Sequence, residues 1–371
     1  MKIIVQISRL LVGGLFIFSG LIKINDPVGT AIKLEEYFEV FATDFAPFFA
    51  YLVPAALFFS VLLSVLEVVL GVAVLLNYRM QLTAWVLLAL IVFFTFLTFY
   101  SAYFNKVTDC GCFGDAIKLT PWQSFIKDII LLVLIVFLFV YRKQMAVSFS
   151  SRTADLAILI VAVLNIGVAW YAIQHLPFID FRAYKVGANI PQLMQPSAQL
   201  RYKYIMTKDG KEEEFMDYPT EGGYEFKEMV LLNPEAQPKI TDYSVWNSEG
   251  DFTEQTFEGN KLLIIMYDAQ KADTDFLPEI RNLAESLPSS IAPIILTASG
   301  EEVFESFRHE HQLAMPYYFA DATVLKTIIR ANPGLVLLKE GVVQAKWHHN
   351  DIPESSTLIE LSEKQNLASQ N

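Results

Sequence analysis

The chain has 371 residues, 53% of them hydrophobic, and carries a formal net charge of −12. Apolar runs long enough to cross a bilayer crowd into the first 176 positions, which excludes a wholly soluble protein. The acid-rich remainder has no basic cluster, which argues against nucleic acid as a partner.

Five apolar segments have about the length of transmembrane helices, which need about 20 mainly apolar residues. The first begins near Met1, but its run is too long for a signal peptide, Arg9 interrupts it, and no small-residue cleavage site follows. We therefore predict an uncleaved first helix and four further spans. The segments are roughly 3–22, 51–76, 80–104, 124–141 and 154–176.

The stretch between the first two spans, GTAIKLEEYFEVFATDFAPFF, predicts an amphipathic helix. At helical spacing, Leu34, Phe38, Phe41 and Phe45 form one stripe, and the charged side chains turn mostly away from it. Two interpretations stay open, a helix that lies in the outer membrane interface and a cap packed on the helical bundle.

Two ionisable residues lie inside predicted spans, where charge is costly. Arg9 and Glu67 both sit about 10 to 14 Å from the cytoplasmic surface, at roughly 1.5 Å per helical residue, so they can pair. The pair would be either part of a cofactor, quinone or proton site, or a buried ion pair that fixes helix register. Gly13, Gly14 and Gly71 would permit close helix approach there.

The chain's two cysteines, Cys110 and Cys112, stand one glycine apart in the loop TDCGCFGD. If Gly111 supplies unusual backbone angles, a disulfide could form, but its small ring would be strained, easily reduced and of little value as a staple. We therefore predict a redox-active pair as the catalytic residues. Two alternatives stay open: metal binding, for which two thiolates leave a site short of ligands, and a purely structural turn.

Basic residues set the expected orientation, because Lys and Arg near membrane ends favour the cytoplasmic side. Their numbers are nearly equal on the two sides, but their density per loop residue places the N terminus in the cytoplasm. Five spans then put the TDCGCFGD loop and the C-terminal domain in the periplasm, where disulfides persist. We expect a multi-pass protein of the bacterial inner membrane with this topology.

The sequence TDCGCFGDAIKLTPWQSFIKDIILLVL resembles the signature of DoxX/MauE-like membrane proteins, in which a Cys-Gly-Cys-Phe-Gly loop precedes a Trp-bearing final bundle helix. The opening RLLVGGLFIFSGLIKINDPVG is similar to the first helix of that family, and the resemblance covers about residues 1–141. It implies a four-helix bundle and, for MauE-like members, a role in forming or maintaining disulfides in a periplasmic partner. This chain departs from that pattern by adding a fifth span and a large soluble domain.

From residue 243 onward, strand and helix patterns alternate, which predicts crossover units around a central sheet. The order, with Asn332-Pro333 before the strand GLVLLK, resembles the thioredoxin-like fold over about 130 residues. In that family a Cys-x-x-Cys or single Cys follows the first core strand, whereas the matching loop here, DAQKADTD, has no sulfur. Thiol exchange by this domain is therefore excluded, and Pro333, as a cis proline, would shape a peptide-binding surface.

The expected fold is thus an α-helical membrane bundle, a four-helix DoxX/MauE-like core plus a fifth transmembrane helix, followed by an α/β thioredoxin-like soluble domain. Its expected parts are the bundle at 1–141, a cytoplasmic loop and fifth helix at 142–176, an exit segment and small β-rich region at 177–238, and the thioredoxin-like domain at 239–371. The β-rich region and the last domain each contain a predicted hairpin turn, at Asp209-Gly210 and Glu340-Gly341.

Two functions fit these patterns. In the first, Cys110 and Cys112 cycle between dithiol and disulfide, exchange with a periplasmic client protein, and pass electrons to an unknown membrane acceptor near Arg9 and Glu67, for which a membrane quinone is one candidate. In the second, a non-enzymatic membrane-anchored scaffold presents the degenerate thioredoxin-like domain to an envelope partner, and the cysteine loop is only structural. The lipid bilayer is a partner in both, and neither requires a metal or nucleic acid.

Overall fold

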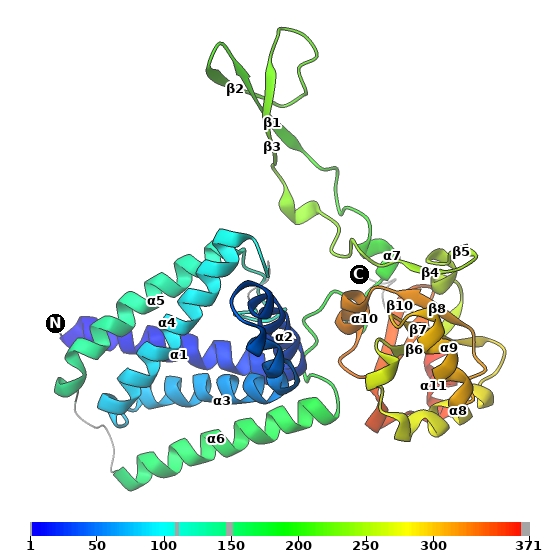
Figure 1. The fold of residues 1–371 in the computed structure, drawn as a ribbon, viewed down its shortest axis with the longest axis horizontal. Helices are drawn as coiled ribbons and strands as arrows, with labels where there is room; N and C mark the ends of the chain where they lie inside the picture. Colours follow the sequence, from blue (N-terminus) through cyan, green and yellow to red (C-terminus); the bar gives the residue numbers. More distant parts are fainter. Residues whose placement is uncertain (1, 108–110, 146–150, 365–371) are drawn as a thin grey trace. The chain divides into compact units, whose positions relative to one another are not determined.

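A computed structural model describes residues 2–107, 111–145 and 151–364 (Figure 1). The chain divides into two compact units, Met1–Phe181 and Arg182–Asn371. The first unit is helical, and the strands of the described residues all lie in the second.

Five helices in the described part of the chain are long and apolar enough to cross a membrane, as the sequence predicts. A helix suits the bilayer because it satisfies its own backbone N–H and C=O groups. The third predicted span, 80–104, begins and ends at the expected residues. The fourth starts at Pro121, earlier than expected, because Thr120 and Gln123 form a capping box there. The helices are α1 (Lys2–Asn25), α3 (Ala56–Leu75), α4 (Met80–Phe104), α5 (Pro121–Tyr141) and α6 (Ser151–Gln174), and a 3₁₀ helix, η1 (Pro47–Ala55), extends the second span backwards.

Helices α1, α3, α4 and α5 share one apolar core. The fifth span, α6, packs beside α1 and α3, where Ala169 is buried with Ile24, Val65 and Val68. The first unit is therefore a four-helix core with one added helix. The buried side chains of the core are Val12, Phe16, Leu70, Val74, Leu87, Leu90, Ile91, Leu131, Ile135 and Leu138.

Glycines allow α1 and α3 to lie unusually close together. A Cβ atom on Gly71 would stand 2.7 Å from the carbonyl oxygen of Gly13, and one on Gly20 would stand 2.8 Å from that of Ser64. Backbone atoms cannot move aside as side chains do, so a larger residue would push the helices apart. Gly13 and Gly71 thus act as the sequence predicts and Gly20 adds to them, whereas a Cβ on Gly14 would meet nothing within 4 Å.

The helix between the first two spans, α2 (Pro27–Asp44), caps the bundle. It starts at Asp26, whose side chain accepts a hydrogen bond from the Gly29 backbone N–H at 2.8 Å. Of the predicted stripe, Phe41 is buried and Phe45 is exposed. The structure thus favours the cap over the interfacial helix, because Phe41 belongs to a buried cluster with Tyr37, Leu97, Tyr100 and Val107.

The second unit contains a three-stranded antiparallel sheet in the order β2-β1-β3. Asp209 and Gly210 have φ angles of 51° and 74° and connect β1 to β2, so the predicted hairpin turn is confirmed. The strands are β1 (Tyr202–Lys208), β2 (Lys211–Phe215) and β3 (Glu225–Leu231).

A larger mixed sheet follows, with seven strands in the order β10-β9-β6-β7-β8-β4-β5. Strand β6 pairs in parallel with β7, and β7 with β8, whereas β9 pairs antiparallel with β6, and β10 antiparallel with β9. The hairpin turn predicted at Glu340-Gly341 is confirmed, with φ angles of 49° and 70°. The strands are β4 (Val245–Asn247), β5 (Gly250–Asp251), β6 (Asn260–Met266), β7 (Ile291–Thr297), β8 (Tyr317–Ala320), β9 (Gly334–Lys339) and β10 (Val342–His348).

Three helices bury apolar side chains against one face of this sheet. Leu277 and Ile280 of α8 (Leu277–Ser286), Phe304 of α9 (Glu301–Glu310) and Leu358 of α11 (Ser355–Glu363) join the residues of β6, β7 and β9 in one core. Strand β8 and helix α11 are additions to the elements expected from the sequence pattern. The other α-helices in the described part of this unit are α7 (Ile190–Leu193) and α10 (Ala322–Ile328).

The contact between α1 and α3 gives the first testable prediction. Gly71→Ala should lower the free energy of unfolding of the bundle by about 1 to 3 kcal/mol, because the added methyl group overpacks against the backbone of α1. Thermal unfolding of the detergent-solubilised protein measures this. Gly14→Ala is the matched control, since it adds the same methyl group on the same helix pair where there is open space. Equal destabilisation by Gly71→Ala and Gly14→Ala would contradict the close approach of α1 and α3.

Candidate functional site

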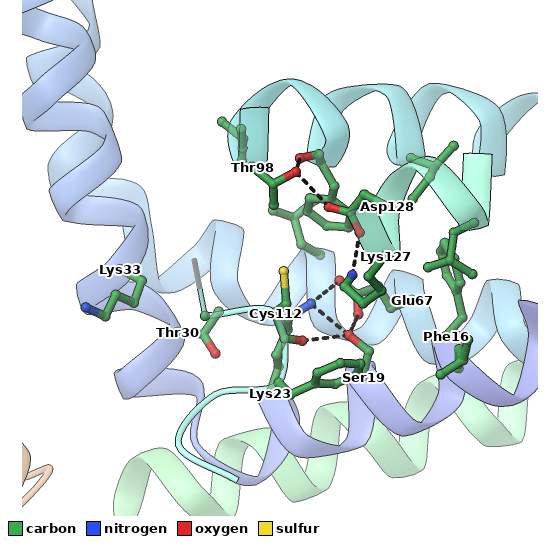
Figure 2. Close-up of a pocket in the computed structure, with 18 of the residues that line it drawn as sticks. Phe16, Ser19, Lys23, Thr30, Lys33, Glu67, Thr98, Cys112, Lys127 and Asp128 are labelled. Atoms are coloured by element: carbon green, nitrogen blue, oxygen red, sulfur yellow. Dashed lines mark hydrogen bonds and ion pairs between the residues drawn. The ribbon is translucent and has the colours of Figure 1, made fainter. Parts of the chain in front are cut away.

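A cavity of about 80 Å³ lies inside the first unit, between α1, α2, α3, α4, α5 and the loop that carries Cys112. A space of this size has room for a few water molecules or part of a small ligand. Its walls are mostly apolar, but two polar clusters and a cysteine face it (Figure 2). The lining residues are Leu15, Phe16, Ser19, Lys23, Thr30, Lys33, Leu34, Tyr37, Leu63, Glu67, Ile91, Phe94, Leu97, Thr98, Gly111, Cys112, Phe113, Lys127, Asp128 and Leu131.

The first polar cluster joins α1 to α3. Lys23 Nζ lies 2.5 Å from Glu67 Oε1, and the two side chains are only 10% and 2% exposed. Ser19 stands one helical turn before Lys23, and its Oγ lies 2.8 Å from Glu67 Oε2 and 3.0 Å from Lys23 Nζ. Lys23 also lies over the ring of Phe94, 5.1 Å from its centre. Glu67 thus has a partner for each of its oxygens.

The second polar cluster joins α4 to α5. Asp128 is almost fully buried, pairs with the neighbouring Lys127, and accepts a hydrogen bond from Thr98 Oγ1 at 3.0 Å. The ammonium group of Lys127 lies 5.5 Å from the centre of the Phe113 ring, next to Cys112 in the chain. This cluster therefore reaches the same loop from the opposite helices.

The Cys112 loop is held on the bundle by its backbone. The Cys112 carbonyl oxygen lies 2.9 Å from Ser19 Oγ, and Figure 2 shows the sulfur directed away from Ser19, into the cavity. Gly111 and Gly114 have φ angles of 63° and 50°, which favour glycine, and the Gly114 N–H donates to the Gly111 carbonyl at 3.1 Å. Cys110 lies outside the described residues, so its bond to Cys112 stays a prediction.

The expected pairing of Arg9 with Glu67 is wrong. Arg9 donates instead to the carbonyl oxygens of Val74 and Leu75, at 3.2 and 2.6 Å. These are the last carbonyls of α3, and the C-terminal end of a helix attracts a cation. Because Gly13 lies against Gly71, the antiparallel register sets Arg9 at the end of α3 and leaves Glu67 to Ser19 and Lys23.

Ser19, Lys23, Thr98 and Asp128 are site residues that the sequence analysis does not predict. For Lys23, the sequence shows only a positive charge just after the first predicted span. Asp128 offers a signal, because it is a carboxylate inside the fourth apolar segment. For neither Lys23 nor Asp128 does the sequence indicate the full set of residues that it contacts, because most residues that meet here are far apart in the chain.

In the second unit, the peptide bond before Pro333 is cis, as expected. The Pro333 carbonyl oxygen lies 3.0 Å from His349 Nδ1, and Asn332 donates to the Asp268 carbonyl at 2.7 Å. Asn332 in turn accepts a hydrogen bond from the Asp273 N–H at 2.9 Å. The loop before β9 therefore lies against the sulfur-free loop after β6, and a peptide-binding role for Pro333 stays a prediction.

The residues that line the cavity all lie in the part of the chain that is similar to known proteins. Residues 1–141, which contain α1 to α5, match the family described as methylamine utilisation protein MauE. Protein TlpB of Flavobacterium psychrophilum is 34% identical over 136 residues, which are 35% of this chain and 35% of that protein. The chain thus spans about a third of the length of this curated relative. With five candidate spans, these matches support a multi-pass membrane protein with a MauE-like N-terminal bundle.

The buried pair gives the second testable prediction. Lys23→Met should destabilise the bundle by about 3 kcal/mol, because it leaves the buried carboxyl group of Glu67 without its partner. Denaturant unfolding in detergent measures the change. Lys33→Met is the matched control, since Lys33 pairs with Glu36 where both side chains are partly exposed, and the loss there should stay below about 1 kcal/mol. A larger loss of stability for Lys33→Met than for Lys23→Met would contradict the prediction that the buried pair matters more.

Proposed function

We propose that this protein is a thiol–disulfide exchange protein of the bacterial inner membrane. Cys110 and Cys112 would cycle between dithiol and disulfide and act on a periplasmic client protein. The observation that carries the proposal is the position of Cys112, whose sulfur faces a cavity between transmembrane helices while its carbonyl is fixed to Ser19.

Disulfide exchange by Cys110 and Cys112 needs a loop that brings the two sulfurs within bonding distance. The backbone conformation of Gly111 supports such a loop. Its positive φ is the backbone angle that glycine adopts without strain, and it stands between the two sulfur-bearing residues. A disulfide closed over one intervening residue adds little stability to the fold, so selection for exchange explains the pair better than selection for stability.

The family match supports the same class of function. It covers the bundle that contains the cavity, and for MauE-like proteins the resemblance implies help in forming or maintaining disulfides in a periplasmic partner. The proposed topology has the N terminus in the cytoplasm and both the cysteine loop and the second unit in the periplasm. That compartment is oxidising, as the proposed exchange requires.

We further propose a thioredoxin-like fold for the second unit, with a role in holding the client. Parallel β6, β7 and β8 flanked by antiparallel β9 and β10, with Pro333 just before β9, support this assignment. The loop after β6 has no sulfur, so the domain would bind, through a surface that includes Pro333, and leave the chemistry to the membrane loop. The same absence favours the second candidate, a scaffold in which the cysteine loop is only structural.

The test is the redox state of Cys110 and Cys112 in intact cells, by acid trapping and labelling with a membrane-impermeant thiol reagent. We expect the pair to be oxidised, to reduce under mild conditions, and then to be labelled from outside. Single Cys110→Ser and Cys112→Ser variants are the matched controls and should each leave one thiol that labels without reduction. Thiols that stay reduced in cells, or that react only from the cytoplasm, would contradict exchange and favour the scaffold.

A further inference from the structure

We propose that the cavity beside Cys112 binds the ring of a lipid-soluble quinone, which takes up the electrons released when Cys110 and Cys112 form a disulfide. The inference rests on the proposed function, because net formation of disulfides in a client needs an electron acceptor. It also moves the acceptor away from one of the two residues expected near it. Glu67 lines the cavity, whereas Arg9 lies at the end of α3 and is not part of the cavity wall.

The charged residues on the cavity wall favour an uncharged ligand. Glu67 and Asp128 are 2% and 1% exposed, and the protein itself supplies a lysine and a hydroxyl group to each of them. A charged ligand would compete with Lys23 or Lys127 for these carboxyl groups, and a buried ion pair that loses one partner is strongly destabilised. An uncharged ligand leaves both pairs intact.

The rest of the wall favours an apolar ligand that carries hydrogen-bond acceptors. Leu63, Phe94 and Leu97 present apolar surface from α3 and α4. Ser19, Thr98 and the two lysines bring O–H and N–H groups, which donate hydrogen bonds, to the same space. A ring with carbonyl oxygens at its edge suits both kinds of wall, because a carbonyl accepts hydrogen bonds and donates none.

The size and position of the cavity suit a ring that enters from the membrane. An enclosed cavity of about 150 Å³ holds a whole benzene ring, so the space of about 80 Å³ here receives one edge of a ring. Leu15 of α1 lines the cavity and is also exposed on the surface of the span. The far edge of the ring and its apolar tail would lie on the membrane side of Leu15.

Cys112 directs its sulfur into the same space, while its carbonyl oxygen lies 2.9 Å from Ser19 Oγ (Figure 2). A quinone is an uncharged ring with carbonyl groups that can take up two electrons and two protons. As the bond between their sulfurs forms, Cys110 and Cys112 lose two electrons and two protons. The quinone gains both and leaves as the quinol, so the step is balanced.

The binding test uses the full-length chain with Cys110→Ser, which keeps Cys112 as its single cysteine and cannot form the disulfide. Decylubiquinone is the probe, because its ring is fully substituted and does not alkylate thiols. At about ten times its Kd it should slow the alkylation of Cys112 by N-ethylmaleimide about tenfold, since only unoccupied protein reacts. Absence of protection, or equal protection by decylbenzene, which has no carbonyl groups, would overturn the proposal.

Leu63→Trp fills the cavity, and Leu62→Trp is its matched control. Leu63 lines the cavity, whereas Leu62, its neighbour on α3, is exposed on the surface of the helix. The larger side chain at position 63 occupies the space of the ring, so alkylation with quinone should stay within about twofold of the rate without it. Leu62→Trp should keep full protection. Equal protection in the two variants contradicts the cavity as the site, and Leu15→Trp replaces Leu63→Trp if the latter does not fold.

Electron transfer is tested separately, with both cysteines present and oxygen excluded. The reduced protein should convert one decylubiquinone to the quinol for each disulfide formed, measured by absorbance and thiol counting, and Leu63→Trp should do so much more slowly than Leu62→Trp. If diamide oxidises the pair and decylubiquinone does not, the quinone site is overturned and exchange by the two cysteines still stands. If neither reagent yields a disulfide, the proposed exchange and the acceptor site both fail.

Discussion

The contact between α1 and α3 is the constraint on which the rest of the membrane unit depends. Glycines at positions 13, 20 and 71 bring the two backbones together, and this fixes which residues face each other. Arg9 then meets the end of α3, and Lys23 meets Glu67. A buried pair of this kind contributes little net stability, but removing one partner is costly, so the pair holds the register.

The same register creates the cavity and positions the cysteine loop. Ser19 lies on α1 between the glycine contacts and Lys23, where it can reach both Glu67 and the Cys112 backbone. On the other side, α4 and α5 supply Thr98, Lys127 and Asp128. Cys112 thereby lines a space that has mostly apolar walls and two buried polar clusters.

The second unit has a different physical basis. Its seven-stranded sheet buries β6 completely from Leu262 to Met266, and helices on one face complete the core. The proposed division of labour follows from where sulfur occurs in the chain. The membrane loop has both cysteines, and the loop after β6, held against the segment before Pro333, has none.

The sequence by itself determined the features that depend on neighbouring residues. Long apolar runs gave the five spans, and Asp-Gly and Glu-Gly dipeptides gave the two hairpin turns, because backbone geometry and membrane partitioning are local properties. It also singled out Glu67 as a costly buried charge. The short strand β8 was missed because four residues leave too little periodicity to read.

Only the tertiary structure decided what Glu67 touches. Ser19 and Lys23 lie 48 and 44 positions from it in the chain, and depth in the membrane alone favoured Arg9. The choice among partners at similar depth depends on how two helices rotate and slide against each other, which their glycines and facing side chains fix together. That information exists only once the helices are packed, so the polar cavity, and with it the candidate site, became visible at that level.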